Sequence, residues 1–189
     1  MKRIIIGRMK NNLLTLFLLA SNLFFSQTSD QFKKIAAGIN TSYTDFEISI
    51  GKSSRDRETN FGLEKRVYEY DTFSIIAYEK DDIAGIDEIS ILSKRQFDNK
   101  ESWYIISKTL NDDSNYFIVD SFVSSIKDKI YKNNLKFNEI VNILRNSSDL
   151  SDYIYYVIFK KNNIYYQMNV IETATLLRIT KDYTTPSKK

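Results

Sequence analysis

Two stretches of the chain combine long apolar runs with a short polar turn. The first, FSIIAYEKDDIAGIDEISI at residues 73–91, has an apolar run, a charged turn and a second run in which Ile89 and Ile91 alternate with polar residues. The second, IYYVIFKKNNIYYQMNVI at residues 154–171, has an apolar run of the same length, a polar turn at residues 160–163 and a second apolar run. Such runs, bounded by polar turns, are typical of strands, so each stretch predicts a β-hairpin.

A second parallel lies upstream of each hairpin. FEISIGKSSRDRETNFG at residues 46–62 and YFIVDSFVSSIKDKIY at residues 116–131 each begin with a strand-like run. Each then reaches a Ser that is suited to cap a helix, Ser53 in the first segment and Ser121 in the second. Both segments therefore predict a short strand followed by a helix. In the second, the apolar residues follow helical spacing at Val119, Phe122, Val123, Ile126 and Ile130.

One more helix and two more strands complete the pattern. The segment LKFNEIVNILRNSSD at residues 135–149 predicts an amphipathic helix, because its apolar residues stand at i, i+3, i+4 and i+7, namely Phe137, Ile140, Val141 and Leu144. ESWYIISKTL at residues 101–110 and TATLLRIT at residues 173–180 resemble strands. The polar residues 182–189 predict a flexible tail.

The order of these elements predicts an α+β fold, with an antiparallel sheet that carries helices on one face. The two hairpin stretches match without a gap between residues 73–83 and 154–164, and each follows a predicted helix. This favours two related helix-then-hairpin units in tandem, which could form one continuous sheet and whose hairpins share turn length and register. We expect an α+β domain at residues 27–181, with unit one at about residues 40–95 and unit two at about residues 100–181.

Residues 1–26 have the layout of a secretory signal peptide. An apolar run from Leu13 to Phe25 is preceded by basic residues and followed by Ser26 and Gln27. The run is shorter than the roughly 20 residues that a transmembrane helix needs. We therefore expect cleavage near Gln27, export to the periplasm or the exterior, and no stable membrane span after cleavage. The basic residues are Lys2, Arg3, Arg8 and Lys10.

Composition excludes several classes of chemistry. None of the 189 residues is His or Cys, which excludes a Ser-His-Asp triad, a Cys nucleophile, a Cys/His zinc site and a disulfide. The leader holds four of the 27 Lys and Arg residues and none of the 24 Asp and Glu residues, so the rest of the chain carries one more acidic than basic residue. Without a basic surplus, nucleic acid is not expected as a partner.

Acidic residues offer two remaining chemistries. EKDDIAGIDE at residues 79–88 places several carboxylates around one turn, which could hold Ca²⁺. Its spacing differs from that of a D-x-D-x-D-G loop, so a solvated hairpin turn is the favoured interpretation. Glu69 and Asp71 are predicted on one strand face and could form a carboxylate pair for hydrolysis. Cross-strand pairing or solvation is the favoured role for this pair, and no metal or cofactor is expected.

Aromatic residues are the candidates for binding a partner. Tyr and Trp combine a large apolar area with a hydrogen-bonding tip and are favoured in binding hot spots. Tyr residues come in pairs two positions apart, which places the members of each pair on one strand face. The candidate set is Tyr68, Tyr70, Trp103, Tyr153, Tyr155 and Tyr165. The alternative is that these side chains fill the core beneath the helices.

Residues 46–92 resemble a known repeat. A strand, a GKS helix entry at residues 51–53, a helix closed by Gly62 and the stretch VYEYDTFSIIAYEKDDIAGIDEISI are similar to the small α+β repeat of the β-lactamase inhibitor protein and outer-membrane small protein A group. Residues 116–180 resemble this repeat more loosely. The resemblance implies an exported, non-enzymatic protein that binds other proteins through its sheet face or adjoining loops. The chain departs from that group in lacking both a lipobox Cys and the disulfide Cys residues often seen there.

Taken together, these features favour an exported, non-enzymatic protein that binds another protein or a component of the cell envelope through an aromatic sheet face. Two alternatives stay open at this point. One is a small secreted hydrolase that uses paired carboxylates, and the other is a structural envelope protein without a discrete site.

Overall fold

A single antiparallel sheet of nine strands organises the described part of the chain. The computed structural model describes residues 31–53, 55–60, 63–71, 73–79, 85–93, 99–147, 152–171 and 174–182. The strand order is β1-β2-β3-β4-β9-β8-β7-β5-β6, and every neighbouring pair is antiparallel. The predicted α+β class is therefore confirmed. The strands are β1 (Arg55–Asn60), β2 (Leu63–Glu69), β3 (Phe73–Glu79), β4 (Ile86–Ser93), β5 (Phe117–Ser125), β6 (Ile130–Asn133), β7 (Tyr153–Lys161), β8 (Ile164–Ile171) and β9 (Ala174–Thr180).

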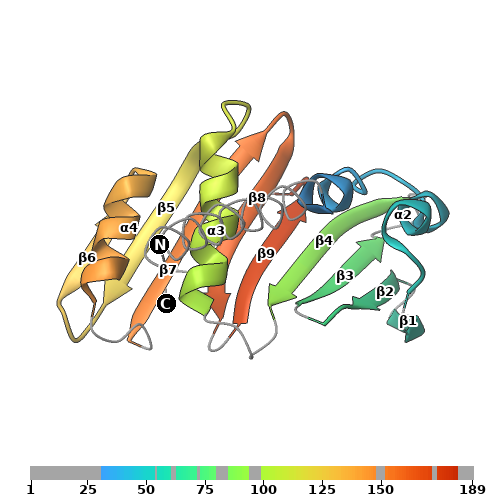
Figure 1. Ribbon diagram of the computed structural model, residues 1–189, viewed down its shortest axis with the longest axis horizontal. Helices are drawn as coiled ribbons and strands as arrows, with labels where there is room; N and C mark the ends of the chain where they lie inside the picture. Colours follow the sequence, from blue (N-terminus) through green and yellow to red (C-terminus); the bar gives the residue numbers. More distant parts are fainter. Residues whose placement is uncertain are drawn as a thin grey trace, which may run out of the picture.

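The helices lie on one face of this sheet (Figure 1). They are α2 (Tyr43–Ile50), α3 (Asn99–Asp112) and α4 (Phe137–Asn146), and residues 31–36 are also helical. α3 crosses the middle of the sheet and contacts β7, β8 and β9, whereas α4 lies near the edge formed by β5 and β6 (Figure 1). We call the opposite face of the sheet the outer face.

The core lies between the helices and the sheet. Its centre is a row of buried apolar side chains that continues from strand to strand through the cross-strand register. Because strand side chains alternate between the two faces, this row lies wholly on the helix-bearing face. The same row crosses from β3 and β4 into β9, β8 and β7, so both halves of the chain share one core. Its members are Ile75, Ile91, Leu177, Met168 and Val157.

Several of the predicted elements are confirmed. α4 follows the apolar spacing that predicted it, since Phe137, Ile140, Val141 and Leu144 are all buried. The predicted hairpins correspond to β3–β4 and β7–β8, and the strand predicted at residues 173–180 corresponds to β9. In α4 the pattern of burial repeats the pattern of apolar residues in the sequence.

The strand and helix predicted within residues 46–62 are wrong, because the helix comes first. The Ser42 side chain caps α2 by accepting the main-chain N–H of Asp45 at 3.1 Å, and the chain leaves the helix at Gly51, whose φ is 97°. Ser53 caps no helix, since β1 follows it. β1 is an all-polar edge strand that pairs with β2 through its backbone. A strand of this kind carries no apolar alternation by which it could be recognised.

The helix predicted after Ser121 is also wrong, because that segment forms β5, a turn and β6. A β-bulge between Ile118 and Asp120 shifts the phase of β5, and three consecutive residues, Ser121 to Val123, are buried. A bulged strand that is buried on both faces loses its period-two pattern, and its apolar residues then resemble a helical stripe.

The strand predicted at residues 101–110 is wrong as well, since these residues form most of α3. The sequence WYII is rich in strand-forming residues. However, Trp103, Ser107 and Leu110 are buried at positions i, i+4 and i+7, which places them on one helix face against the sheet. Packing of this face outweighs the local strand propensity.

The tandem repeat is not confirmed. The β3–β4 connection spans residues 80–85, whereas β7 and β8 are joined by residues 162–163 alone, so the turn lengths are not equal as expected. The second half also contains α4 between β6 and β7, and the described residues of the first half include no helix between their strands. The predicted leader at residues 1–26 and residues 183–189 of the predicted tail lie outside the described residues.

Candidate functional site

Four of the six aromatic candidates belong to the main hydrophobic core. Tyr68, Trp103, Tyr153 and Tyr155 are buried against the helices and the sheet. Trp103 of α3 meets the ring of Tyr155 on β7 edge-on, with ring centroids 5.3 Å apart. Because these four side chains are buried, the prediction that they form a contact surface is wrong, and the alternative that they fill the core holds for them. They instead supply core packing: Tyr68 meets the ring of Phe46 on α2, and Tyr155 meets Trp103 on α3.

The other two aromatic candidates are half-buried. Tyr70 stacks on Phe73 with ring centroids 4.6 Å apart, and its hydroxyl donates to the carbonyl of Ile50 at 2.8 Å, so it fastens α2 to the sheet. Tyr165 packs against a small cluster on the outer face, and the Lys160 amine lies 5.0 Å from its ring centroid. Tyr165 is therefore the member of the set that the structure places on the outer face.

The predicted acidic sites are dispersed. Glu69 ends β2 and Asp71 lies in the connection to β3, with both side chains exposed, so the two do not share a strand face as predicted. Asp87 and Glu88 form ion pairs of 2.6 Å with Lys181 and Arg178, respectively. Residues 81–82 of the same acidic run lie outside the described residues. Within the described part of the chain, no group of three or more His, Cys, Asp or Glu residues could hold a metal ion.

Exposed apolar side chains gather at one edge of the sheet. Five of the six large hydrophobic residues that are exposed in the described chain lie on β5, on β7, or on the turn and strand that follow β5. Tyr131 and Ile154 are 63% and 61% exposed and lie on the outer face, in register with Ser124 between them. We call the set the apolar rim, and it comprises Phe117, Val119, Ile126, Tyr131 and Ile154.

The turn between β5 and β6 holds the most exposed residue of the apolar rim. Ile126 is 95% exposed, and Lys129 takes a positive φ of 54°, which lets the chain reverse direction within residues 126–129. The Asp128 carboxylate accepts a hydrogen bond from the Tyr153 hydroxyl, which ties the turn to β7. The turn and β6 also carry exposed Lys side chains, namely Lys127, Lys129 and Lys132. The sequence analysis did not predict this surface, although Lys and apolar residues interleave in IKDKIYK at residues 126–132.

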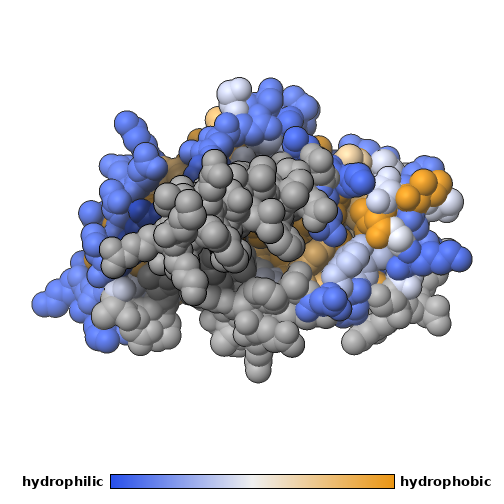
Figure 2. Space-filling model, in the orientation of Figure 1, coloured by the Kyte–Doolittle hydropathy of each residue, from blue (hydrophilic) through white to orange (hydrophobic). Residues whose placement is uncertain are grey.

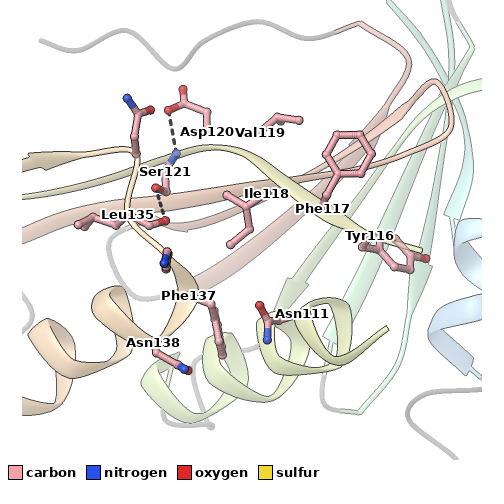
Figure 3. A pocket seen from close by; sticks show the side chains of 12 residues that line it. Asn111, Tyr116, Phe117, Ile118, Val119, Asp120, Ser121, Leu135, Phe137 and Asn138 are labelled. Carbon is pink, nitrogen blue, oxygen red and sulfur yellow. Dashed lines mark hydrogen bonds between the residues drawn. The ribbon is translucent and has the colours of Figure 1, made fainter. Parts of the chain in front are cut away.

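A cavity of about 670 Å³ lies beside the same edge, and we call it the β5 groove. In Figure 3, β5 runs along one side of it, while Asn111 of α3 and Phe137 and Asn138 of α4 lie across from the strand. The wall at one end is the loop from Asn134 to Lys136. Hydrophilic residues gather over α4 and β6 on the helix-bearing face (Figure 2). The lining of the groove mixes apolar side chains, such as Ile118 and Leu135, with polar ones, such as Asn111 and Asn138.

The polar groups of the groove are fixed by local hydrogen bonds. The Asp120 carboxylate accepts from the main-chain N–H of Ser121 at 2.7 Å and from the Tyr156 hydroxyl at 3.2 Å. The Ser121 hydroxyl donates to the carbonyl of Leu135 at 2.8 Å, which holds the loop against β5 (Figure 3). The shape of the groove is thus maintained by contacts within the chain.

A second cavity of about 410 Å³ lies between the helical residues 31–36 and the end of α3. At its margin the main-chain N–H of Asn115, and then its side-chain amide, lower the pKa of Asp113. Burial, followed by the neighbouring Tyr166 hydroxyl, raises the pKa of Tyr116. These bonds stabilise the connection from α3 to β5, and they do not assemble an acid and a base around a common point.

None of the helices in the described residues is both long enough and apolar enough to cross a membrane. No protein-family model, curated protein or solved structure matches the chain.

Proposed function

We propose that this is an exported, non-enzymatic protein that binds a protein partner, and that the apolar rim beside the β5 groove is its contact surface. The observation that carries the proposal is the concentration of exposed apolar side chains on β5, β6 and β7, with buried aromatic residues directly behind them. Scattered exposed apolar residues are normal on soluble proteins, whereas a cluster of them marks an interaction site.

The outer face supports this assignment. Beside Tyr131 and Ile154, the rings of Phe122 and Tyr156 stack with centroids 5.5 Å apart, and Phe122 also meets the edge of the Tyr131 ring at 5.2 Å. The Phe122 and Tyr156 rings are themselves buried, so they are not contact side chains but a rigid support for the exposed Tyr131 ring. A partner would bury the side chains of Tyr131 and Ile154, and a rigidly supported Tyr ring loses little side-chain entropy when it is covered.

Export is supported by the layout of residues 1–26, in which basic residues precede an apolar run that ends at Phe25. Intact-mass measurement on fractionated cells tests this part of the proposal. We expect a species that begins near Gln27 outside the cytoplasm. A full-length species confined to the cytoplasm would overturn it.

The binding surface is tested with matched variants. Tyr131→Ser and Ile154→Ser should each reduce the amount of partner captured from envelope extract about tenfold, since losing one hot-spot side chain costs about 1–2 kcal/mol of binding free energy. Ile48→Ser is the control, because Ile48 is 80% exposed on α2, away from the rim. Quantitative mass spectrometry measures the capture. Equal capture by all three variants would contradict the proposed surface.

A further test separates binding from hydrolysis. Glu69→Gln and Asp71→Asn remove the carboxylates on which the hydrolase alternative rests. We expect both variants to capture the partner as the unaltered protein does. Loss of biological function in these variants with capture intact would favour the hydrolase instead.

A further inference from the structure

β5 is longer than the strand that covers its edge. β7 pairs with β5 from Phe117 to Ser125, but β6 pairs only with Phe122 to Ser125. At Asn134 the chain takes a positive φ of 54° and donates its N–H to the Ser121 carbonyl at 3.0 Å, and it then leaves the sheet toward α4. No described strand pairs with the edge of β5 that faces away from β7 over residues 117–119.

This open edge borders the β5 groove, whose lining includes Tyr116, residues 117–121 of β5 and residues 134–138 that follow β6. The groove thus lies where β6 would continue if it were as long as its neighbour. Unpaired strand edges present main-chain donors and acceptors that readily pair with another extended chain. A volume of about 670 Å³ is within the range of roughly 300–1,000 Å³ that is usual for ligand sites.

We propose that the open edge of β5 binds an extended peptide segment of the partner protein, which adds to the sheet as a short strand in line with β6. This inference rests on the proposed function, since it names the part of the partner that enters the site. Main-chain hydrogen bonds to β5 would hold the segment, and the groove would receive its alternate side chains.

The geometry favours a free peptide segment over the edge of a second folded sheet. β6 projects one strand spacing, about 4.8 Å, beyond β5, so a long rigid edge strand would meet β6 before it reached residues 117–119. The bulge between Ile118 and Asp120 further twists this edge away from a flat partner. Both features are recognised protections against sheet-to-sheet aggregation, and they leave room for a short extended chain.

The lining indicates the chemistry of the peptide. In Figure 3, Ile118 points from β5 into the groove, and Leu135 and Phe137 contribute the other apolar part of its lining. The Asp120 carboxylate is engaged by Ser121 and Tyr156, whereas Lys136 is exposed at the end of the groove. We therefore expect a peptide with an apolar residue near Ile118 and an acidic residue near Lys136.

A displayed library of random unstructured nonapeptides tests the proposal. We expect enriched sequences that combine apolar and acidic residues, with binding weakened at least tenfold by Asn138→Trp, which fills the groove. Asn142→Trp is the matched control, because Asn142 is equally exposed on α4 but does not line the groove. Lys136→Gln should reduce the preference for acidic peptides without filling the groove. Circular dichroism checks that each variant is folded.

The mode of binding is tested with the selected peptides themselves. N-methylation at alternate positions removes the donors that face β5, so one of the two alternating sets should abolish binding while the other is tolerated. Because the chain has no Cys, Asn138→Cys supplies a single thiol in the groove, and bound peptide should slow its alkylation. The thiol of Ile48→Cys should remain unprotected.

Failure of this inference is distinguishable from failure of the proposed function. An absence of enriched peptides, indifference to both N-methylation patterns, or equal effects of Asn138→Trp and Asn142→Trp would overturn strand addition at β5. If capture from envelope extract still depended on Tyr131 and Ile154, the apolar rim would stand as the contact surface without the open edge. If capture depended on neither the rim nor the groove, both proposals would fall.

Discussion

At the scale of single residues, the buried aromatic side chains carry stability. Tyr155 lies in the core between Trp103 and the sheet. Tyr155→Ala should lower the free energy of unfolding by about 3–5 kcal/mol, since truncating a large core side chain loses its burial and leaves a cavity. Ile48→Ala should change it by less than about 0.5 kcal/mol, because Ile48 is mostly exposed. Urea denaturation followed by circular dichroism measures both values, and similar losses would contradict the assigned burial.

Buried tyrosines also set the response to alkali. Burial is the leading cause that raises the pKa of Tyr68, and the neighbouring Glu47 carboxylate raises it further. The folded protein therefore disfavours the phenolate. The protonated Tyr68 hydroxyl therefore makes its full contribution to stability below the unfolded pKa of about 10. That contribution is lost as the pH rises from there through the higher pKa of the folded protein.

Tyr68→Phe tests this linkage. We expect the free energy of unfolding of the unaltered protein to fall above about pH 10, and the fall to be less steep in the variant, which cannot ionise at that position. The variant also loses the 3.3 Å hydrogen bond from the Tyr68 hydroxyl to Glu47, so it should be less stable near neutral pH. The slope of the unfolding free energy with pH is the measurement. Identical slopes would show that Tyr68 does not contribute to the alkaline transition.

At the scale of elements, the connection between the first described helix and α2 depends on close contact between the backbone of Gly38 and the ring of Phe46. A Cβ at Gly38 would lie 2.4 Å from two ring carbons of Phe46, which is fully buried against Tyr68. Gly38→Ala should therefore destabilise the protein by about 1–3 kcal/mol through overpacking. Chemical denaturation measures the loss.

A double variant identifies the cause of that loss. Phe46→Leu removes the ring that the new methyl group would meet, so Gly38→Ala should cost less in this background than in the unaltered protein. A non-additive pair of this kind indicates direct contact. Additive losses would assign the effect of Gly38→Ala to the backbone of the turn instead.

The elements that the sequence predicts correctly are those whose apolar residues fit the periodicity of one class of secondary structure. α4 has a clean 3.6-residue stripe and polar residues on its other face, and β9 has a compact run of strand-forming residues. β5 is predicted as part of a helix because its bulge gives the apolar residues a helical spacing. α3 is predicted as a strand because WYII is rich in strand-forming residues. Local preference did not decide these segments, and packing against the rest of the sheet did.

The sequence analysis did not predict the candidate site, although part of it has a visible pattern. Lys and apolar residues interleave visibly between Ile126 and Lys132. The β5 groove, however, forms between residues 116–121 and 134–138 together with Asn111. The groove exists because the chain leaves the sheet at Asn134, so that β6 is shorter than β5. No periodicity in the sequence predicts where β6 ends. The aromatic set was misplaced for a related reason, since Tyr is equally suited to core packing and to binding surfaces.

At the scale of the whole molecule, the last described strand joins the two halves of the chain. β9 lies between β4 and β8, so the strands before α3 and the strands after it form one uninterrupted sheet. Arg178 of β9 pairs with Glu88 of β4 at 2.6 Å, and Lys181 pairs with Asp87 at the same distance. Apolar contact continues across this junction through Leu177 and Ile91. Two independent tandem units would not share a core row in this way.

This arrangement predicts that the protein unfolds as one cooperative unit. Trp103, the single Trp of the chain, reports on the half that contains α3, and a fluorophore on Ile48→Cys reports on the half that contains α2, because the chain has no other thiol. Since separating β4 from β9 would expose the buried side chains of Ile89, Leu177 and Ile179 to water, neither half should unfold alone. The two probes should therefore give the same urea midpoint and the same slope. Midpoints that differ by more than the error of the fit would show that the halves are separately stable, as a tandem repeat of self-sufficient units would require.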